Sequence, residues 1–250
     1  MITAYTLPES VAAAAAQLGD GTAVMGGGTI VMPALQAGTL RAERVIGLAR
    51  TGLDEVVRTD GRTSLGATAR LAAVADLGYP VLSPAARAVG GPALRNMATV
   101  GGNLLAGPPY GDVGVALLAL GAEVELVGPA DARRLPLADL WDSFRAGEEI
   151  IGALHFDRAP GVYLRWARRA ANSPAVVCVA VSGGRVALGG VAPHPVRSPA
   201  AEAHFDDPQA AGEAAADAID PPTDAIASAW YRRRMTRLFV RRALEEANAV

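Results

Sequence analysis

Apolar and polar positions divide the chain into short strands and helices, interrupted by two glycine clusters. Ser10–Leu18 has a helical pattern with Ser10 at the N-cap position, and Thr22–Met25 is a short apolar strand. The dipeptide Asp60-Gly61 separates two alternating segments and predicts a hairpin. The other expected elements before residue 160 are the strands Arg44–Leu48, Glu55–Arg58, Thr63–Ala67, Glu123–Val127 and Glu149–His155, and the helices Ile30–Leu35, Leu71–Ala75, Ser83–Val89 and Asp112–Leu120.

The pattern changes after Asp157–Gly161. Three strands are expected there, Val162–Ala167, Val176–Val181 and Arg185–Gly190, and Ser182-Gly183-Gly184 predicts a tight hairpin between the last two. A proline-rich loop and an alanine-rich polar segment follow, and a long helix is expected from about Ala225 to Ala247. The sequence therefore predicts an α+β chain with two domains, residues 1–160 and 161–250.

Composition excludes several function classes. The chain has 250 residues, 51% of them hydrophobic, and a formal net charge of −2, which argues against a nucleic-acid partner. Its apolar runs are far shorter than the ~18 residues of a transmembrane helix. No basic segment precedes an apolar core near Met1, so we expect no secretory signal, no transmembrane segment and a cytoplasmic protein.

Cysteine and histidine usage narrows the chemistry further. Cys178 is the single cysteine, so the chain cannot hold a cluster that needs four thiolates, and it is expected to be a buried core thiol. The histidines His155, His194 and His204 lack metal-ligand spacing, so no metal is expected. All 23 basic residues are arginine, which excludes lysine chemistry.

The two glycine clusters are the strongest functional signal. They are Gly26-Gly27-Gly28-Thr29 and Thr99-Val100-Gly101-Gly102-Asn103, with Asp112 nine residues after the asparagine. Glycine lets a backbone adopt positive φ and approach a ligand closely, and consecutive N–H groups form anion sites. Two such sites suit a dinucleotide with a central pyrophosphate. Val31 breaks the Rossmann spacing, and Pro108-Pro109 replaces the Lys-Ser/Thr of a P-loop.

These clusters resemble the two FAD loops of the molybdenum hydroxylase flavoprotein subunits, which include the medium subunit of carbon monoxide dehydrogenase and the flavin domain of xanthine dehydrogenase. The resemblance runs in order along nearly the whole chain. It is carried by Ala23–Thr29, Leu94–Leu104, Pro109, Asp112, Tyr163, Arg168, Arg169, Gly189–Pro193, Arg197, Glu202, Ser228–Arg232, Met235 and Arg241–Leu244.

The resemblance implies a PCMH-type FAD-binding domain of two α/β subdomains, followed by a smaller C-terminal domain with a three-stranded antiparallel sheet and helices. It implies pyrophosphate contacts from both glycine loops, including the Thr99 hydroxyl and backbone amides. Asp112 would bind ribose or ribityl hydroxyls, Ile151 would pack on the flavin, and Arg165 would lie beside the isoalloxazine. The implied cofactor-binding residues are Val24, Met25, Gly26, Gly27, Gly28, Thr29, Ile30, Val31, Thr99, Val100, Gly101, Gly102, Asn103, Asp112, Ile151 and Arg165.

The implied function is that of an FAD-binding electron-transfer subunit. FAD would be non-covalent, because neither glycine loop contains a histidine or cysteine. Electrons would come from iron–sulfur clusters in a small partner subunit, after reaction at molybdopterin in a large one, and would leave to NAD, a quinone or another acceptor. A dimer of heterotrimers is the implied assembly. No residue is expected to act as a general acid, general base or nucleophile.

Two alternatives stay open. One is a stand-alone FAD oxidoreductase that resembles the enolpyruvate-reducing enzyme of cell-wall synthesis. The other is a degenerate scaffold without FAD, suggested by departures from the family pattern at Ala106, Gly107-Pro108-Pro109 and Tyr110-Gly111. The arginines of the last helix form either a solvated face or a docking surface. They are Arg232, Arg233, Arg234, Arg237, Arg241 and Arg242.

Overall fold

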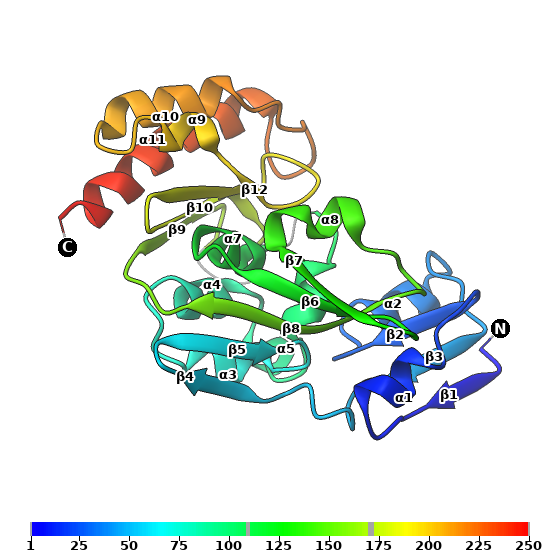
Figure 1. Cartoon of the computed structure of the whole chain (residues 1–250). Coiled ribbons are helices and arrows are strands. Elements are labelled where there is room, and N and C mark those ends of the chain that lie inside the picture. The colour runs from blue at the N-terminus through cyan, green and yellow to red at the C-terminus, as the bar shows by residue number, and fades with distance from the viewer. Residues whose placement is uncertain (1, 109–110, 170–172, 250) are drawn as a thin grey trace.

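The structure, a computed structural model, describes residues 2–108, 111–169 and 173–249. Pro109 and Tyr110, which belong to the departures from the family pattern, lie outside the described residues. Three sheets follow one another across the molecule, from the N-terminal sheet at one end to a pair of long C-terminal helices at the other (Figure 1).

The N-terminal sheet is small and parallel. Its strands have the order β1-β3-β2, and its helix α1 begins at the predicted N-cap, where Ser10 Oγ accepts from the Ala13 N–H at 3.1 Å. The predicted strand Thr22–Met25 is confirmed as β2, which leads directly into the first glycine cluster. The elements are β1 (Ala4–Thr6), α1 (Val11–Ala15), β2 (Thr22–Met25), α2 (Val31–Gln36) and β3 (Arg44–Gly47).

The central sheet is antiparallel, with the order β4-β5-β8-β6-β7. Its first two strands form the predicted hairpin, and Asp60 and Gly61 have φ of 50° and 84°, as a tight hairpin turn requires. The strands are β4 (Val56–Thr59), β5 (Arg62–Gly66), β6 (Glu123–Val127), β7 (Ala132–Pro136) and β8 (Ile150–Asp157). The helices of this region are α3 (Leu71–Ala75), α4 (Leu82–Ala88), α5 (Pro92–Arg95), α6 (Val100–Leu104), α7 (Asp112–Ala119), η1 (Leu137–Asp139) and α8 (Leu140–Ser143).

The C-terminal sheet has four strands where three were expected. The three predicted strands are present, and Val196–Arg197 in the proline-rich loop adds β12 at the edge, giving the antiparallel order β12-β11-β10-β9. A two-residue strand carries no readable alternation, so the sequence could not reveal it. The elements are β9 (Val162–Ala167), β10 (Ala175–Ser182), β11 (Arg185–Gly189), β12 (Val196–Arg197), α9 (Pro199–Glu202), α10 (Pro208–Asp217) and α11 (Ala229–Ala247).

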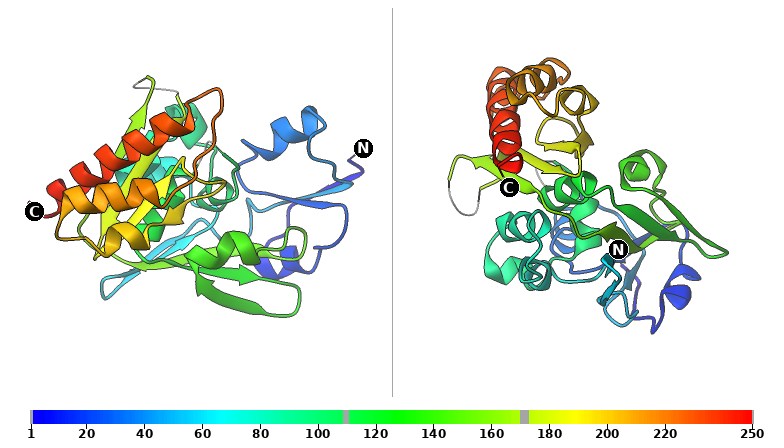
Figure 2. Two further views of the ribbon diagram at one scale, coloured as in Figure 1. Left: turned by 90° about the horizontal axis from the view of Figure 1, so that it is seen from above. Right: turned by 60° about the vertical axis from the view of Figure 1, so that its left-hand side comes forward.

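Both faces of this sheet are covered. Every residue of β10 is buried, and α7 packs on one face while α11 packs on the other (Figures 1 and 2). Residues that alternate along the strands separate accordingly: Cys178 and Ala180 join the core around α7, whereas Val177 and Val179 join the core under α11. The C-terminal sheet, which comes from the second predicted domain, therefore completes the hydrophobic core around α7 in the first predicted domain.

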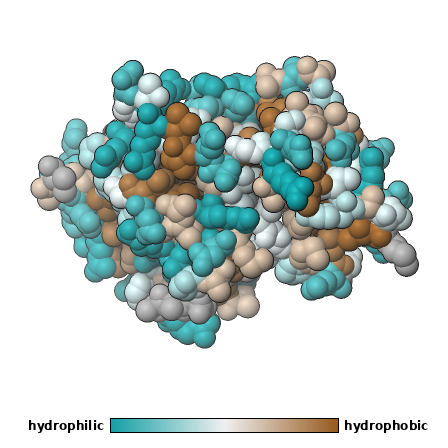
Figure 3. Space-filling view, turned by 90° about the horizontal axis from the view of Figure 1, so that it is seen from below, coloured by the Kyte–Doolittle hydropathy of each residue, from teal (hydrophilic) through white to brown (hydrophobic). Residues whose placement is uncertain are grey.

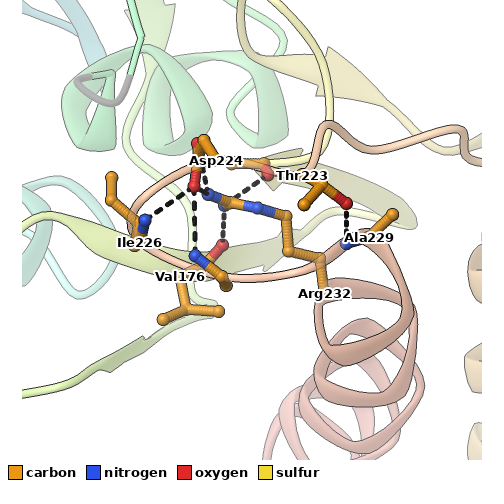
Figure 4. Close-up of polar contacts among 8 residues, drawn as sticks. Val176, Thr223, Asp224, Ile226, Ala229 and Arg232 are labelled. Carbon is orange, nitrogen blue, oxygen red and sulfur yellow. Dashed lines mark hydrogen bonds and ion pairs between the residues drawn. The ribbon is translucent and has the colours of Figure 1, made fainter.

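The last helix starts later than expected and hides one of its arginines. Asp224 Oδ1 accepts from the N–H groups of Ile226 and Ala227, and this turn delays α11 until Ala229. Arg232 is 1% exposed and joins the helix to the sheet (Figure 4). Its Nη1 donates to the carbonyls of Val176 and Gly190, and its Nη2 donates to both oxygens of Asp224 at 2.8 Å. Arg232 is thus a buried clamp rather than part of a solvated face.

No helix in the described part combines the length and the apolar character that a bilayer crossing needs. On the face drawn in Figure 3, apolar side chains form separate islands among polar ones.

Candidate functional site

The two glycine clusters, called here the first glycine segment (26–29) and the second glycine segment (99–103), lie directly against each other. A Cβ at Gly27 would lie 1.8 Å from the Met97 carbonyl oxygen, and one at Gly26 would lie 2.7 Å from Thr99 Oγ1. Of the glycines in the two segments, only Gly28 has positive φ, at 75°. Close packing of two backbones, more than unusual φ, therefore explains the glycines, and the two expected anion sites form one junction.

Backbone donors at this junction come mainly from the first glycine segment. The second segment is the start of α6, and its N–H groups already donate within the protein: Val100 to Ala69 O, Gly101 to Ala67 O, Asn103 to Thr99 O and Gly102 to Thr99 Oγ1. By contrast, the N–H groups of Gly27, Gly28 and Thr29 find no acceptor among the described residues. The second segment keeps the Thr99 hydroxyl hydrogen for a ligand, and its backbone amides are less available than we expected.

A cavity lies on each side of the junction, and Gly102 lines both. The Arg165 cavity has a volume of about 500 Å³, and the Ile151 cavity about 450 Å³; both fall within the usual range of small-molecule sites. Besides Gly102, residues of the predicted set line the Arg165 cavity at Thr29, Ile30, Asn103, Asp112 and Arg165. Those that line the Ile151 cavity are Val24, Gly26, Val31, Thr99, Gly101 and Ile151.

Asn103 carries an unpaired polar atom at this site. Its side chain lines the Arg165 cavity and is 7% exposed, yet among the described residues its Oδ1 has no hydrogen-bond partner. Buried polar atoms are almost always paired, because an unpaired one costs about 1–3 kcal/mol. An orphaned acceptor at a cavity wall, beside free backbone donors, fits a ligand that brings its own donors and phosphate oxygens. The residues present therefore fit FAD.

Asp112, Arg165 and Tyr163 form one buried network at the Arg165 cavity. Asp112 is the first residue of the wholly buried helix α7, where a negative charge complements the helix dipole. Arg165 Nε donates to Asp112 Oδ1 at 3.0 Å, and Tyr163 Oη donates to the same oxygen at 2.5 Å. Arg165 Nη2 also donates to the Ser173 carbonyl. Burial raises the pKa of Tyr163 well above its usual value, with a further contribution from the neighbouring Cys178 and Asp112, so the phenol stays protonated.

The Ile151 cavity is lined by a charged residue too, Glu149. Glu149 is 6% exposed and accepts from Arg133 Nε at 2.8 Å and Arg133 Nη2 at 3.1 Å. The hydrogen bond from Arg133 lowers the pKa of Glu149 below its ordinary value, although burial opposes the shift. The carboxylate is therefore ionised at neutral pH.

The structure separates two residues that the resemblance placed at one end of the ligand. Ile151 and Arg165 line different cavities, which share Gly102 as a wall residue. Among the predicted residues, Met25, Gly27, Gly28 and Val100 line neither cavity; Gly27 and Gly28 lie at the junction, between the cavity-lining residues Gly26 and Thr29.

Sequence reasoning missed Tyr163 and Glu149 as residues of this site. Tyr163 and Arg165 are two residues apart on β9, so a strand of period two predicts that they share a face. Their meeting with Asp112 spans more than fifty residues and has no local signal. Trp166, the next residue after Arg165, lies on the opposite face of the strand and is 39% exposed. Within the described ranges, no three His, Cys, Asp or Glu side chains are grouped to hold a metal ion.

Two family models together match most of the chain. The FAD binding domain in molybdopterin dehydrogenase matches residues 1–156, and the CO dehydrogenase flavoprotein C-terminal domain matches residues 163–247. The first match alone covers more than half of the chain.

Relatives and solved structures agree with these models. The carbon monoxide dehydrogenase medium chain of Afipia carboxidovorans is 28% identical over 98% of this chain and 96% of its own length. The nicotine 6-hydroxylase medium subunit of Paenarthrobacter nicotinovorans is 30% identical over 68% of each chain. A carbon monoxide dehydrogenase structure from Hydrogenophaga pseudoflava superposes with a TM-score of 0.91 at 25% identity, covering 100% of this chain and 98% of that one. This chain therefore belongs to the FAD-binding medium subunits of the molybdenum hydroxylase family, which are components of oxidoreductases.

Proposed function

We propose that this chain binds FAD non-covalently at the glycine junction and passes electrons between the iron–sulfur clusters of a partner subunit and an acceptor such as NAD or a quinone. The observation that carries the proposal is the junction itself: free N–H groups and an orphaned Asn103 Oδ1 between two cavities that meet at Gly102. Bound FAD would supply the redox chemistry, and the protein would supply position and electrostatics.

We assign the pyrophosphate to the junction. The N–H groups of Gly27, Gly28 and Thr29 are the available backbone donors, and the Thr99 hydroxyl can donate beside them. Asn103 Oδ1 would accept from a ligand hydroxyl at the edge of the Arg165 cavity. The two backbones are packed too tightly for the ligand to pass between them, so it must cross the junction on the side of Gly102.

We assign the isoalloxazine to the Arg165 cavity and the adenosine to the Ile151 cavity. A reduced isoalloxazine carries negative charge. The Arg165 cavity offers it a guanidinium that is paired with Asp112, whereas the Ile151 cavity offers the Glu149 carboxylate, whose partner Arg133 lies outside the lining. Asp112 would then accept from ribityl rather than ribose hydroxyls. Ile151 would pack on the adenosine end instead of on the flavin.

We propose the partners on the same basis. Relatives are named as medium chains or subunits of larger complexes, which supports a molybdenum-binding large subunit and an iron–sulfur small subunit. A dimer of heterotrimers, the domain boundary at residue 160 and a cytoplasmic location remain predictions.

The first test is the absorption spectrum of the purified protein before and after addition of FAD, with Asn103→Ala measured beside it. We expect flavin absorbance in the wild type that is released as FAD on denaturation. Asn103→Ala should weaken FAD binding about tenfold, the value of one buried hydrogen bond, without lowering the stability of the FAD-free protein, because Oδ1 has no protein partner to lose. The control is Asn96→Ala, since Asn96 is exposed and lines neither cavity.

The outcomes separate the alternatives. A colourless protein that binds no added FAD would favour the hypothesis of a scaffold without FAD. A yellow protein that by itself oxidises a reduced nicotinamide with an enolpyruvyl substrate would favour a stand-alone oxidoreductase. Equal FAD affinity in the wild type and Asn103→Ala would contradict the proposal that FAD binds at the glycine junction.

A further inference from the structure

We infer that Tyr163 is a positioning residue for the cofactor: by holding Asp112 Oδ1, it fixes the Asp112–Arg165 pair at the cavity wall and raises the midpoint potential of bound FAD. The inference rests on the proposed function, and it concerns a residue that would not touch the cofactor. Tyr163 does not line the Arg165 cavity, whereas Asp112 and Arg165 both do.

The first step is the geometry of the donors. The Tyr163 hydroxyl and the Arg165 Nε both donate to Asp112 Oδ1, at 2.5 and 3.0 Å. Among the described residues, Asp112 Oδ2 has no hydrogen-bond partner, and it is not a buried orphan. Two donors on one oxygen leave the other oxygen for the cavity. Tyr163 thus decides which part of the carboxylate a ligand meets.

The second step is the rigidity of the phenol. Its ring packs against the core around α7, and the thiol of Cys178, which is 2% exposed, lies beside its hydroxyl. Burial keeps both groups protonated, so they add no charge at neutral pH. The phenol is therefore a fixed neutral donor, and such a donor stabilises the carboxylate without neutralising it.

The third step is the field at the cavity. Asp112 and Arg165 carry opposite charges, and their side chains are 8% and 15% exposed, so solvent screens them weakly. A hydrogen bond from Tyr163 draws charge from Asp112 and leaves the Arg165 cation less compensated. A less compensated cation favours the negatively charged reduced flavin and raises its midpoint potential. Loss of the phenol hydroxyl should lower that potential.

The experiment compares Tyr163→Phe with Tyr79→Phe in the purified protein or its complex. Tyr79 is the matched control because it is 4% exposed and its hydroxyl bonds to Thr63 Oγ1 at 2.8 Å, away from both cavities. The readouts are the FAD dissociation constant, the midpoint potential of bound FAD and the free energy of unfolding without FAD. Tyr163→Phe should bind FAD about three- to tenfold more weakly and at a lower potential, the size of a partly lost charged hydrogen bond. Tyr79→Phe should change only the free energy of unfolding.

A double-mutant cycle with Asp112→Asn tests whether Tyr163 acts through Asp112. If it does, Tyr163→Phe will not shift the potential further in the Asp112→Asn background. Equal shifts in both backgrounds, or a folded Tyr163→Phe protein with wild-type affinity and potential, would overturn the inference alone. A wild-type protein that binds no FAD would overturn the proposed function and this inference with it. If Tyr163→Phe does not fold, an unchanged midpoint potential in Asp112→Asn serves as the overturning result, because the inference acts through that carboxylate.

Discussion

Arg232 is a buried arginine and Arg165 a partly buried one, and each joins an aspartate to a backbone carbonyl near the C-terminal sheet. Arg232 is enclosed: its side chain is 2% exposed, and two carbonyls and both oxygens of Asp224 accept from it. Arg165 is 15% exposed and lines a cavity, and its aspartate is the deeper partner of the pair. The same pair of residue types, arginine and aspartate, thus forms an enclosed clamp at Arg232 and part of a cavity wall at Arg165.

The two arginines differ in how many hydrogen-bonding groups around them lack a partner within the protein. The Arg232 guanidinium donates to four acceptor atoms inside the protein. Among the described residues, Arg232 Nε and Thr236 Oγ1, one turn further along α11, are the buried atoms there without a partner. Around Arg165, Asn103 Oδ1 and the N–H groups of the first glycine segment remain available beside a cavity. Donors and acceptors that hydrogen-bond to each other within the protein stabilise the fold. Donors and acceptors without a partner at a cavity wall can instead bind a ligand.

The largest expected effect comes from Arg232→Met. It removes the partner of the part-exposed Asp224 and the hydrogen bonds from Arg232 to the carbonyls of Val176 and Gly190. Because several hydrogen bonds from a charged group are lost at once, the free energy of unfolding should fall by about 3–5 kcal/mol. Urea denaturation measures the change. Arg237→Met is the control, because Arg237 is exposed and its ion pair with Asp217 is long, at 4.0 Å. Similar losses in both variants would erase the distinction between clamp and surface.

Gly27→Ala should come next. The new Cβ would overlap the Met97 carbonyl and push the two glycine segments apart, at a cost of about 1–3 kcal/mol. FAD affinity should fall more than stability, because the junction itself changes shape. Gly107→Ala is the control, since a Cβ there meets nothing within 4 Å. Titration with FAD and denaturation together check this, and a wild-type affinity in Gly27→Ala would contradict it.

Arg165→Gln should affect the cofactor rather than the fold. Tyr163 still donates to Asp112 in this variant, so the FAD-free protein should lose only about 1–2 kcal/mol. FAD should bind about tenfold more weakly and at a lower midpoint potential. Arg168→Gln, at an exposed arginine beyond the same strand, is the control. A stability loss as large as that of Arg232→Met, with unchanged FAD affinity, would show that Arg165 is a second clamp.

The smallest expected effect is on the stability of the protein at acid pH, through Asp224. Burial opposes ionisation of Asp224, but hydrogen bonds from the Ala227 backbone and from Arg232 hold its pKa below the ordinary value. A lowered folded pKa stabilises the protein above the ordinary pKa of 3.8, and that stability is lost as the pH falls through the folded value. Asp224→Asn should therefore flatten the acid side of the stability curve. Asp206→Asn, at an exposed aspartate outside the clamp, should leave that slope unchanged.

Local signals in the sequence predicted the fold well. Ser10, Asp60-Gly61 and the apolar run Val176–Val181 gave correct elements, because caps, turns and short apolar runs depend on near neighbours. The signal for α10 was present but not used: Asp207 caps it and Pro208 occupies its first turn. The edge strands β1, β7 and β12 were missed, since they are short or rich in polar residues and their pairing depends on distant strands.

The candidate site was predictable only in part. The glycine segments were visible because a Cβ would overlap the Thr99 side chain at Gly26 and the Met97 carbonyl at Gly27. Their direct contact, the separation of Ile151 from Arg165 and the network of Tyr163 with Asp112 depend on tertiary packing, which no periodicity records. Arg232 shows the same limit, because its exposed neighbours on α11 have the same residue type.

The burial of β10 on both faces has a consequence for biosynthesis. Helix α7 and the glycine junction precede it in the chain, but the face of α7 that carries Val115 is covered only when Cys178 and Gly189 arrive. A nascent chain that ends near residue 160 would expose that apolar face and lack Arg165. The Arg165 cavity is therefore incomplete until β9 and the residues before β10 have been translated, because Arg165, Ser173 and Pro174 form part of its wall.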